Sequence, residues 1–147
     1  MIDEIDRKII RSLVSDGRIS FRDLGERVHL SPNATAERVR RLQSTGAIRG
    51  FRAVVNWSQL GYVVEAYIDV TLKPETSAQN FEAVLTKIPG IVSAAVVTGS
   101  SDFRVRVACK DQSDLMRVID TLRARAGIQG TNSAVICHEI NVSDRLA

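Results

Sequence analysis

The feature that most constrains this chain is a pair of amphipathic segments near its N-terminus, separated by only about three residues. The first segment opens at Ser20, with Asp23 at capping-box spacing, and carries apolar residues at helical intervals. The second opens at Ser31-Pro32, an N-cap followed by proline at the first helical position, and Gly46 ends it where a left-handed C-cap belongs. So short a gap between two helices is the tight turn of a helix-turn-helix, which makes DNA binding the first hypothesis.

A preceding helix is also predicted, because apolar residues recur at helical spacing from Asp3 to about Ser15 before Asp16-Gly17 stops the pattern. On the helix after Ser31, the 3.6-residue period separates a buried face from an exposed one. The buried face holds Thr35, Ala36, Val39 and Leu42, and the outward positions are Asn33, Ala34, Glu37, Arg41 and Ser44, with Arg38 and Arg40 on the flanks. This exposed face has the shape and polarity to enter a DNA major groove.

The segment after this helix, from Ile48 to Val55, alternates like a β-strand and predicts a wing that carries Arg49 and Arg52. The charge is distributed unevenly: up to Leu60 the chain has 11 Lys and Arg against 7 Asp and Glu, and beyond it 9 against 10. The basic residues from 38 to 52 follow one another with no acid between them. Such a patch suits phosphate, although a solvated basic helix face would give the same charge.

The second part of the chain predicts an alternation of strands and helices. Strand-type alternation begins at Tyr62, a helix opens at Ser77 and ends at Pro89-Gly90, and strands are expected at 91–98 and 103–109 on either side of a turn. A second helix and a last strand, from about Asn132 to Val142, complete the series. The order β-α-β-β-α-β is that of the ferredoxin-like fold, in which both helices cover one face of a four-stranded antiparallel sheet.

These elements predict an α+β protein of two domains. Residues 1–60 form a winged helix-turn-helix domain, with the motif itself at about 21–40, and residues 61–147 form a ferredoxin-like βαββαβ domain. The sheet face that lacks helices would carry both signs of charge, on Glu65, Tyr67, Asp69, Arg104 and Arg106. A solvated face and a self-complementary two-fold interface are both open hypotheses. DNA binding favours the interface, because one helix-turn-helix contacts too few bases for specificity.

The composition and the motifs of the chain exclude several other functions. The two histidines and two cysteines, His29, His138, Cys109 and Cys137, do not stand at metal-ligand spacing, and we expect both cysteines to be small core residues. No nucleophile-elbow or phosphate-loop motif occurs, so we expect no enzyme, no metal and no cofactor. The composition is ordinary for a globular protein, at 44% apolar and 25% charged residues, and no apolar run approaches the roughly 20 residues of a membrane span. With an acidic N-terminus unlike a signal peptide, the chain is expected to be cytoplasmic.

Several segments resemble those of one protein family. They are Ile5-Asp6-Arg7-Lys8-Ile9-Ile10, Asp16-Gly17-Arg18-Ile19-Ser20, Leu30-Ser31-Pro32, Glu37-Arg38-Val39-Arg40-Arg41-Leu42 and Gly46-Ala47-Ile48-Arg49-Gly50-Phe51 in the first domain, and Ile88-Pro89-Gly90-Ile91-Val92, Val97-Thr98-Gly99, Asp102-Phe103 and Thr131-Asn132-Ser133-Ala134-Val135-Ile136 in the second. Over nearly its whole length the chain resembles the Lrp/AsnC regulators, the leucine-responsive and asparagine-type transcription factors of bacteria and archaea. One departure is His29, in the turn where this family often has glycine, and histidine tolerates a left-handed turn better than a β-branched residue does.

Double-stranded DNA is therefore the expected partner of the first domain. The residues expected to face base edges or adjacent phosphates are Ser31, Asn33, Ala34, Glu37, Arg38 and Arg41. Those expected to contact the DNA backbone are Ser20, Arg22, Arg40, Arg49 and Arg52.

The resemblance implies a ligand-response role for the second domain. In this family the domain forms dimers that assemble into octamers, and it binds amino acids or related small molecules near the turn that matches 99–102. The implied effector residues are Gly99, Ser100, Ser101, Asp102, Thr131 and Ser133, although the family usually carries an aromatic residue in place of Ser101. Asp102 would pair with an α-ammonium group, and backbone N–H groups around Gly99 would hold a carboxylate. A plain hairpin turn explains this glycine and aspartate equally well.

Three binding functions make different predictions. A ligand-responsive, sequence-specific regulator keeps its sequence preference at physiological salt. An architectural protein that wraps or bends DNA, without a ligand, has an affinity that depends almost wholly on salt. A small-molecule-binding module that acts on protein partners has no DNA affinity near that salt. The helix-turn-helix and the resemblance favour the first.

Overall fold

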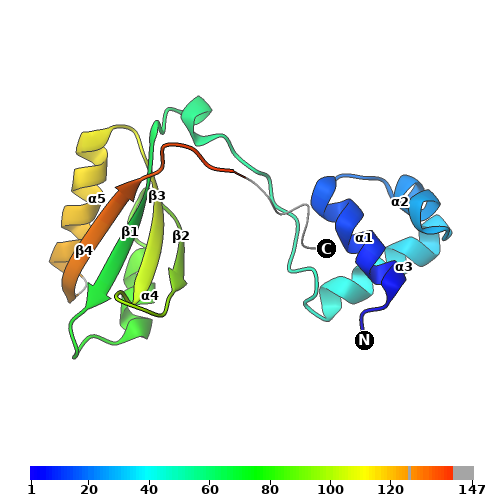
Figure 1. Ribbon diagram of the computed structural model, residues 1–147, viewed down its shortest axis with the longest axis horizontal. Helices are drawn as coiled ribbons and strands as arrows, with labels where there is room; N and C mark the ends of the chain where they lie inside the picture. The colour runs from blue at the N-terminus through cyan, green and yellow to red at the C-terminus, as the bar shows by residue number, and fades with distance from the viewer. Residues whose placement is uncertain (126, 141–147) are drawn as a thin grey trace. The chain divides into compact units, whose positions relative to one another are not determined.

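The computed structural model describes residues 1–125 and 127–140, which divide into two compact units, residues 1–54 with residue 140 and residues 55–139 (Figure 1). The first unit holds helices α1 (Glu4–Ser15), α2 (Phe21–Val28) and α3 (Pro32–Ser44). The second holds the short 3-10 helix η1 (Trp57–Leu60), strands β1 (Val64–Leu72), β2 (Ile91–Val96), β3 (Phe103–Cys109) and β4 (Ile128–Val135), and helices α4 (Ala78–Leu85) and α5 (Gln112–Arg125). The predicted α+β fold class is confirmed.

Each helix of the first unit begins at a side-chain cap. Asp3, Ser20 and Ser31 cap the three helices in turn, and each accepts a backbone N–H from the third residue along the chain. At α1 the capping is reciprocal, because the Asp6 carboxylate accepts the Asp3 N–H at 3.1 Å. The capping box expected at Ser20 takes a different form, in which its hydroxyl donates to the Asp23 carboxylate at 2.7 Å.

The helix-turn-helix forms where the sequence predicts it. His29 ends α2 with a φ of 58°, in the left-handed region that favours glycine, as expected for the turn between the two helices. The predicted buried face of α3 is confirmed, and its residues are Thr35, Ala36, Val39 and Leu42. Val39 and Leu42 form the core of this unit together with Ile9, Leu24 and Val28.

The predicted wing strand from 48 to 55 is wrong. Residues 49–55 carry no regular secondary structure, and Gly50 within them has a φ of 147°. A strand needs a neighbour to pair with its N–H and C=O groups, and no segment of residues 1–125 or 127–140 pairs with this one. Arg49 and Arg52 are therefore exposed on irregular backbone rather than on a strand.

The second unit is an antiparallel sheet in the order β2-β3-β1-β4, with α4 and α5 on one face (Figure 1). This arrangement is the predicted ferredoxin-like βαββαβ fold. Its core lies between the sheet and the helices, where Ile68 and Val105 of the central strands pack with Phe81 of α4 and Leu122 of α5. Alternate residues of β1 are buried, as the sequence pattern predicts, and the same alternation holds in β3 from Phe103 to Val107, after which Ala108 and Cys109 are both buried.

Two strand boundaries differ from those predicted. β2 ends at Val96 rather than at residue 98, and β4 runs over Ile128–Val135 rather than from about residue 132 to residue 142. Residues 141 and 142 lie outside the described residues. The start of β4 was not predicted because Gly130 weakens the strand pattern there. The β1–β4 register is also irregular beside this glycine, between Thr71 and Leu72 of β1.

Candidate nucleic-acid interface and effector site

The exposed face of α3 is oriented by the side chains buried beneath it. Thr35 has no exposed surface and its hydroxyl donates to the Ser31 carbonyl at 2.9 Å, while Val39 and Leu42 are each 2% exposed. The structure brings together on this helix the residues predicted to face bases, with Arg40 beside them: Ser31, Asn33, Ala34, Glu37, Arg40 and Arg41 are exposed, and Arg38 is half-buried. A buried face that cannot rotate fixes which side chains α3 presents.

Two of these arginines are tied to α1 by a carboxylate that the sequence did not single out. The Asp6 side chain has no exposed surface, and its two oxygens accept from Arg38 Nη1 at 2.9 Å and from Arg41 Nη2 at 2.7 Å. Arg38 Nη1 also donates to Asp3 at 2.6 Å. The sequence contains an indication of this ion pair. Asp6 lies one turn before Ile9 on the apolar stripe of α1, and a charge buried there is costly unless it has a partner.

Two members of this cluster, Asp3 and Arg38, have shifted pKa values. The hydrogen bond from Arg38 lowers the pKa of the Asp3 carboxyl to about 2, and the Asp6 N–H adds to the effect. Hydrogen bonds to Asp3 and Asp6 in turn raise the pKa of Arg38 above its ordinary value. Asp3 and Arg38 are therefore both charged at neutral pH.

The other predicted phosphate contacts of the first unit are solvated. Ser20 stands exposed at the N-terminus of α2, and the Arg22 side chain is 81% exposed at 3.5 Å from Glu26. On α3, the Arg40 side chain lies 3.0 Å from Glu37, and both are largely exposed. Exposed pairs of this kind contribute little to stability, so a phosphate can replace the glutamates at small cost.

The helix-free face of the sheet carries ion pairs within the chain. Arg104 donates to both carboxylate oxygens of Asp69, at 2.7 and 2.9 Å. Arg106 bridges Glu65 and Glu139, each at 2.8 Å. The opposite charges that the sequence places on this face pair between the neighbouring strands β1 and β3, and Glu139, which follows β4, is a further partner that the strand pattern did not predict.

The turn between β2 and β3 forms the first part of the predicted effector site. Gly99 has a φ of 119°, which few other residues adopt. The Asp102 carboxylate accepts the Leu72 N–H at 2.8 Å, and the Thr71 hydroxyl lies 3.4 Å from the Ser100 carbonyl oxygen. Asp102 is exposed, but its carboxylate already ties the turn to the end of β1, as the plain-hairpin hypothesis requires.

Thr131 and Ser133 lie across β1 from this turn. The β1–β4 register places Thr131 opposite Val70 and Ser133 opposite Ile68, so both face the side of the sheet that α4 and α5 cover. The Thr131 hydroxyl accepts from Arg123 of α5 at 2.9 Å. The structure therefore keeps the residues of the 99–102 turn together and separates Thr131 and Ser133 from them.

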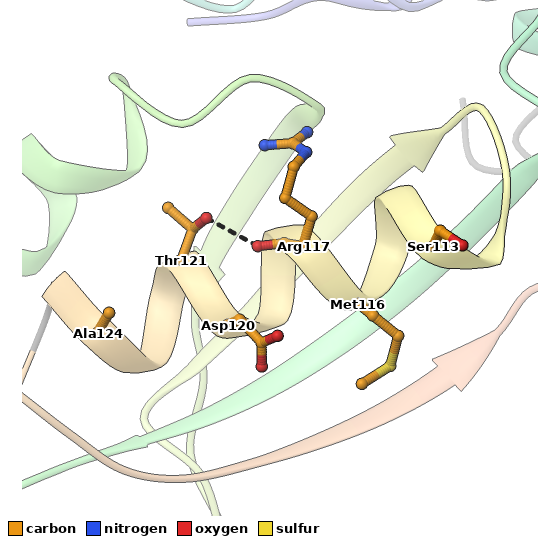
Figure 2. A pocket seen from close by; sticks show the side chains of 6 residues that line it. All are labelled: Ser113, Met116, Arg117, Asp120, Thr121 and Ala124. Atoms are coloured by element: carbon orange, nitrogen blue, oxygen red, sulfur yellow. Dashed lines mark hydrogen bonds between the residues drawn. The ribbon is translucent and has the colours of Figure 1, made fainter.

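Apart from these sites, the described residues form a depression on the surface of α5. A shallow depression follows the side of α5 that faces away from the sheet (Figure 2), and it is lined by Ser113, Met116, Arg117, Asp120, Thr121 and Ala124. These side chains belong to one helix, and the bond drawn among them runs from the Thr121 hydroxyl to the Arg117 carbonyl. Within residues 1–125 and 127–140, no group of three acidic, histidine or cysteine side chains is placed to hold a metal.

The two cysteines differ, against the expectation that both belong to the core. Cys109 is buried in β3, and burial raises the pKa of its thiol to about 11. Cys137 is exposed because β4 ends at Val135, before this residue.

In the part of the chain that the structure describes, no helix is long and apolar enough to cross a membrane.

A helix-turn-helix with an arginine-bearing second helix, joined to a ferredoxin-like domain, defines a DNA-binding transcriptional regulator with a regulatory domain. Residues 2–43 match the model of the AsnC-type helix-turn-helix domain, and residues 65–146 match that of the Lrp/AsnC ligand binding domain. The chain belongs to the Lrp/AsnC family, as its sequence motifs implied. Members of this family are transcriptional regulators and not enzymes.

Two related regulators support the same family assignment over nearly the full length of the chain. The chain is 32% identical over 145 residues to the HTH-type transcriptional regulator Rv2324 of Mycobacterium tuberculosis, covering 99% of this chain and 97% of that protein. It is 34% identical over 149 residues to the leucine-responsive regulatory protein of Escherichia coli, covering 99% and 90%.

Solved structures of two relatives contain an amino acid. The feast or famine regulatory protein Rv3291c of M. tuberculosis, in complex with L-methionine, superposes with a TM-score of 0.90 at 29% identity, covering 100% of this chain and 99% of that one. The transcriptional regulator NMB0573 of Neisseria meningitidis, in complex with L-methionine, gives a TM-score of 0.87 at 29% identity, covering 96% and 93%.

Proposed function

We propose that this chain is a sequence-specific regulator that places α3 in the major groove of double-stranded DNA. The observation that carries the proposal is the exposed face of α3, which buried side chains hold in one orientation. The base-facing set is Ser31, Asn33, Ala34, Glu37, Arg38 and Arg41, and the backbone set is Ser20, Arg22, Arg40, Arg49 and Arg52. We further propose that it acts in the cytoplasm, where its DNA would be.

Selection from a random-sequence duplex pool tests sequence specificity without a known operator. The full-length protein is expected to enrich one motif with two similar half-sites, and to retain its preference at physiological salt. An architectural function, the second candidate, predicts no enrichment and an affinity that depends almost wholly on salt. No binding at that salt would leave the protein-partner hypothesis.

Arg41→Ala tests the assigned recognition face. If Arg41 contacts a base, the variant loses about 1–3 kcal/mol of binding to the selected duplex and relaxes its preference at one position. If Arg41 contacts only phosphate, binding weakens equally on all sequences and the salt slope falls by about one. Gel-shift titrations compare it with Arg11→Ala, an exposed arginine of α1 outside the proposed interface, after thermal melting shows both variants to be folded. Unchanged affinity would remove Arg41 from the interface.

We propose that the second unit binds an amino acid or a related small molecule at the turn 99–102. Gly99 supplies an open backbone there, and Asp102 supplies an exposed carboxylate for an α-ammonium group. The matched ligand-binding domain, and the L-methionine bound to two similar regulators, support an amino acid as the ligand. The proposed site also includes Thr131 and Ser133, which lie across β1 from the turn.

A thermal-shift screen with L-methionine and the other common amino acids tests this site. A ligand at 100 times its Kd stabilises the folded protein by about 2.7 kcal/mol, which raises the melting temperature. Asp102→Asn is the matched variant, because its side-chain oxygen still accepts the Leu72 N–H while its charge is gone. An increase in the wild type that Asp102→Asn lacks supports the site. No increase with any amino acid, in a protein that binds DNA, makes the turn structural.

We also propose that the chain assembles as a dimer, and that dimers assemble further into an octamer. The helix-free sheet face, with its Arg104–Asp69 and Arg106–Glu65 pairs, is the candidate two-fold interface. Light scattering of the purified protein measures the assembly directly, and a monomer at the concentrations that bind DNA would refute this part.

A further inference from the structure

Asp6 joins α1 to the proposed recognition helix through a buried carboxylate. Among the described residues it is the charged residue whose side chain is wholly removed from solvent. Its Oδ1 accepts from Arg38 at 2.9 Å, and its Oδ2 accepts from Arg41 at 2.7 Å and from the Asp3 N–H at 3.1 Å. Both carboxylate oxygens are therefore engaged, and an arginine of α3 is a partner of each.

Stability alone is a poor explanation for this carboxylate. Burying an ion pair costs much of what the attraction returns, and an apolar side chain of similar size often packs as well or better. The neighbouring contacts between α1 and α3 are apolar, through Ile9, Val39 and Leu42. An apolar residue at position 6 would suit that surface, although it would leave the Asp3 N–H without its capping partner. Beyond this cap, the carboxylate matters for what it does to the two arginines.

Each arginine is held by only one part of its guanidinium group. Arg38 uses Nη1 for both Asp3 and Asp6, and Arg41 uses Nη2 for Asp6. The Arg38 side chain remains 25% exposed and the Arg41 side chain 50% exposed. The carboxylates thus hold the guanidinium groups of Arg38 and Arg41, which lie one helical turn apart, on the side that faces α1. The other N–H groups of both guanidinium groups do not contact these carboxylates. A rigid guanidinium fork selects a paired acceptor, such as the edge of guanine, more sharply than a mobile one.

We propose that Asp6 is a positioning residue for DNA recognition. It holds Arg38 and Arg41 in one orientation, with Asp3 as a second support for Arg38, so that the protein discriminates between sequences instead of attracting all DNA alike. This inference rests on the proposed placement of α3 in the major groove.

Removing the charge of the Asp6 carboxylate is expected to affect two measured quantities differently, namely the affinity for any duplex and the preference for one sequence. Neutralising Asp6 takes a negative charge from beside the interface, so binding to any duplex stays equal or strengthens and its salt dependence steepens. The arginines lose their fixed direction, so the preference for one sequence falls. A loss of folded protein would instead weaken binding to every duplex together.

The experiment compares full-length Asp6→Asn with the wild type on two duplexes. One is the duplex that the wild type selects from a random pool, and the other has the same bases in shuffled order. We expect the ratio of the two affinities to fall about tenfold, while affinity for the shuffled duplex stays equal or rises. Glu4→Gln, exposed on α1, makes the same change of charge and is expected to leave the ratio unchanged.

Asp3→Asn keeps the inference testable if Asp6→Asn does not fold. Asparagine caps a helix as well as aspartate does, so α1 keeps its start, while Arg38 loses one charged partner. We expect a fall of about threefold in the ratio. An unchanged ratio in the folded variants, or an equal loss on both duplexes, overturns the inference. If the wild type itself selects no sequence, the proposed function fails, and the inference fails with it.

Discussion

At the scale of single residues, the carboxyl group of Asp3 has two roles, since it caps α1 and also binds Arg38 of α3. Asp3 accepts the Asp6 N–H at 2.8 Å, which caps the helix, and also accepts a hydrogen bond from Arg38 of α3. A carboxylate at a helix N-terminus is favourable on its own, and a bond between two charged groups is stronger than a neutral one. Helix initiation and the attachment of α3 to α1 are therefore coupled at Asp3.

This coupling gives the first unit a contribution to stability that depends on pH. The pKa of Asp3 is about 2, below its ordinary value of 3.8, because the folded state favours the ionised carboxyl. The contribution is complete above pH 3.8 and is lost as the pH falls through 2. We expect Arg38→Met to raise the pKa toward 3.8 but not fully to it, since the Asp6 N–H still donates.

Carbon NMR titration of the Asp3 carboxyl measures this shift directly. Arg40→Met is the control, because Arg40 lies on the same helix and pairs with Glu37 instead. An Asp3 pKa that stays near 2 without Arg38 would show that the helix terminus alone holds it down.

At the scale of elements, the contact between α2 and α3 depends on a missing side chain. Gly25 is buried in α2, and a Cβ built on it would lie 2.6 Å from the Leu30 carbonyl oxygen and 3.0 Å from the Thr35 hydroxyl. The first neighbour is backbone of the turn, and it cannot move without shifting α3. The close approach of the two helices therefore requires glycine at this position.

Gly25→Ala is accordingly expected to destabilise the first unit. Alanine gains about 1 kcal/mol in helix propensity, but the clash with the turn costs more, for a net loss of about 1–2 kcal/mol. Gly17→Ala is the matched control, because its Cβ would make ordinary contacts at 3.6 and 3.7 Å, and we expect a small gain or no change. Thermal and denaturant unfolding measure both. A Gly25→Ala variant as stable as the wild type would mean that the turn can move.

Elements were predictable from the sequence where their cause is local. Helix caps such as Ser31, the left-handed His29 and the alternation of β1 depend on residues within a few positions, and all are confirmed. The wing failed because a strand depends on a partner that no local pattern reveals.

The candidate sites follow the same division. The exposed face of α3 follows from the helical period. The arginine cluster instead joins residues that are 35 apart, Asp6 and Arg41, and the turn proposed as the effector site is held by residues that are 30 apart, Leu72 and Asp102. Such pairings depend on the packing of whole elements, so local patterns could mark a polar residue on an apolar stripe but not name its partner.

At the scale of the whole molecule, the two proposed binding functions belong to different compact units. Residues 1–54 have their own core around Leu24 and Val39, and residues 55–139 have another around Ile68 and Val105. The amino-acid site proposed at the turn 99–102 and the DNA site proposed on α3 therefore share no residue and rest on separate cores. Its effect on DNA binding is a coupling free energy between two sites, carried by the chain or by its assembly.

Coupling of this kind is reciprocal, and we expect both directions to be measurable in the full-length protein. The amino acid that raises the melting temperature should change the affinity for the selected duplex by about 5–150-fold, and saturating duplex should change the affinity for the amino acid by the same factor. Asp102→Asn should weaken amino-acid binding in the presence and absence of DNA alike. Arg49→Ala should weaken DNA binding but keep the coupling factor, because Arg49 belongs to the exposed segment 49–54 of the first unit.

Gel shifts with and without the amino acid, and calorimetric titrations of the amino acid with and without duplex, give the two factors at one protein concentration. If the two coupling factors are equal and well above one, both ligands shift the same equilibrium between states of the protein. A factor of one in both directions, with both ligands bound, would separate the functions of the two units and leave a DNA-binding protein whose small-molecule site does not regulate it.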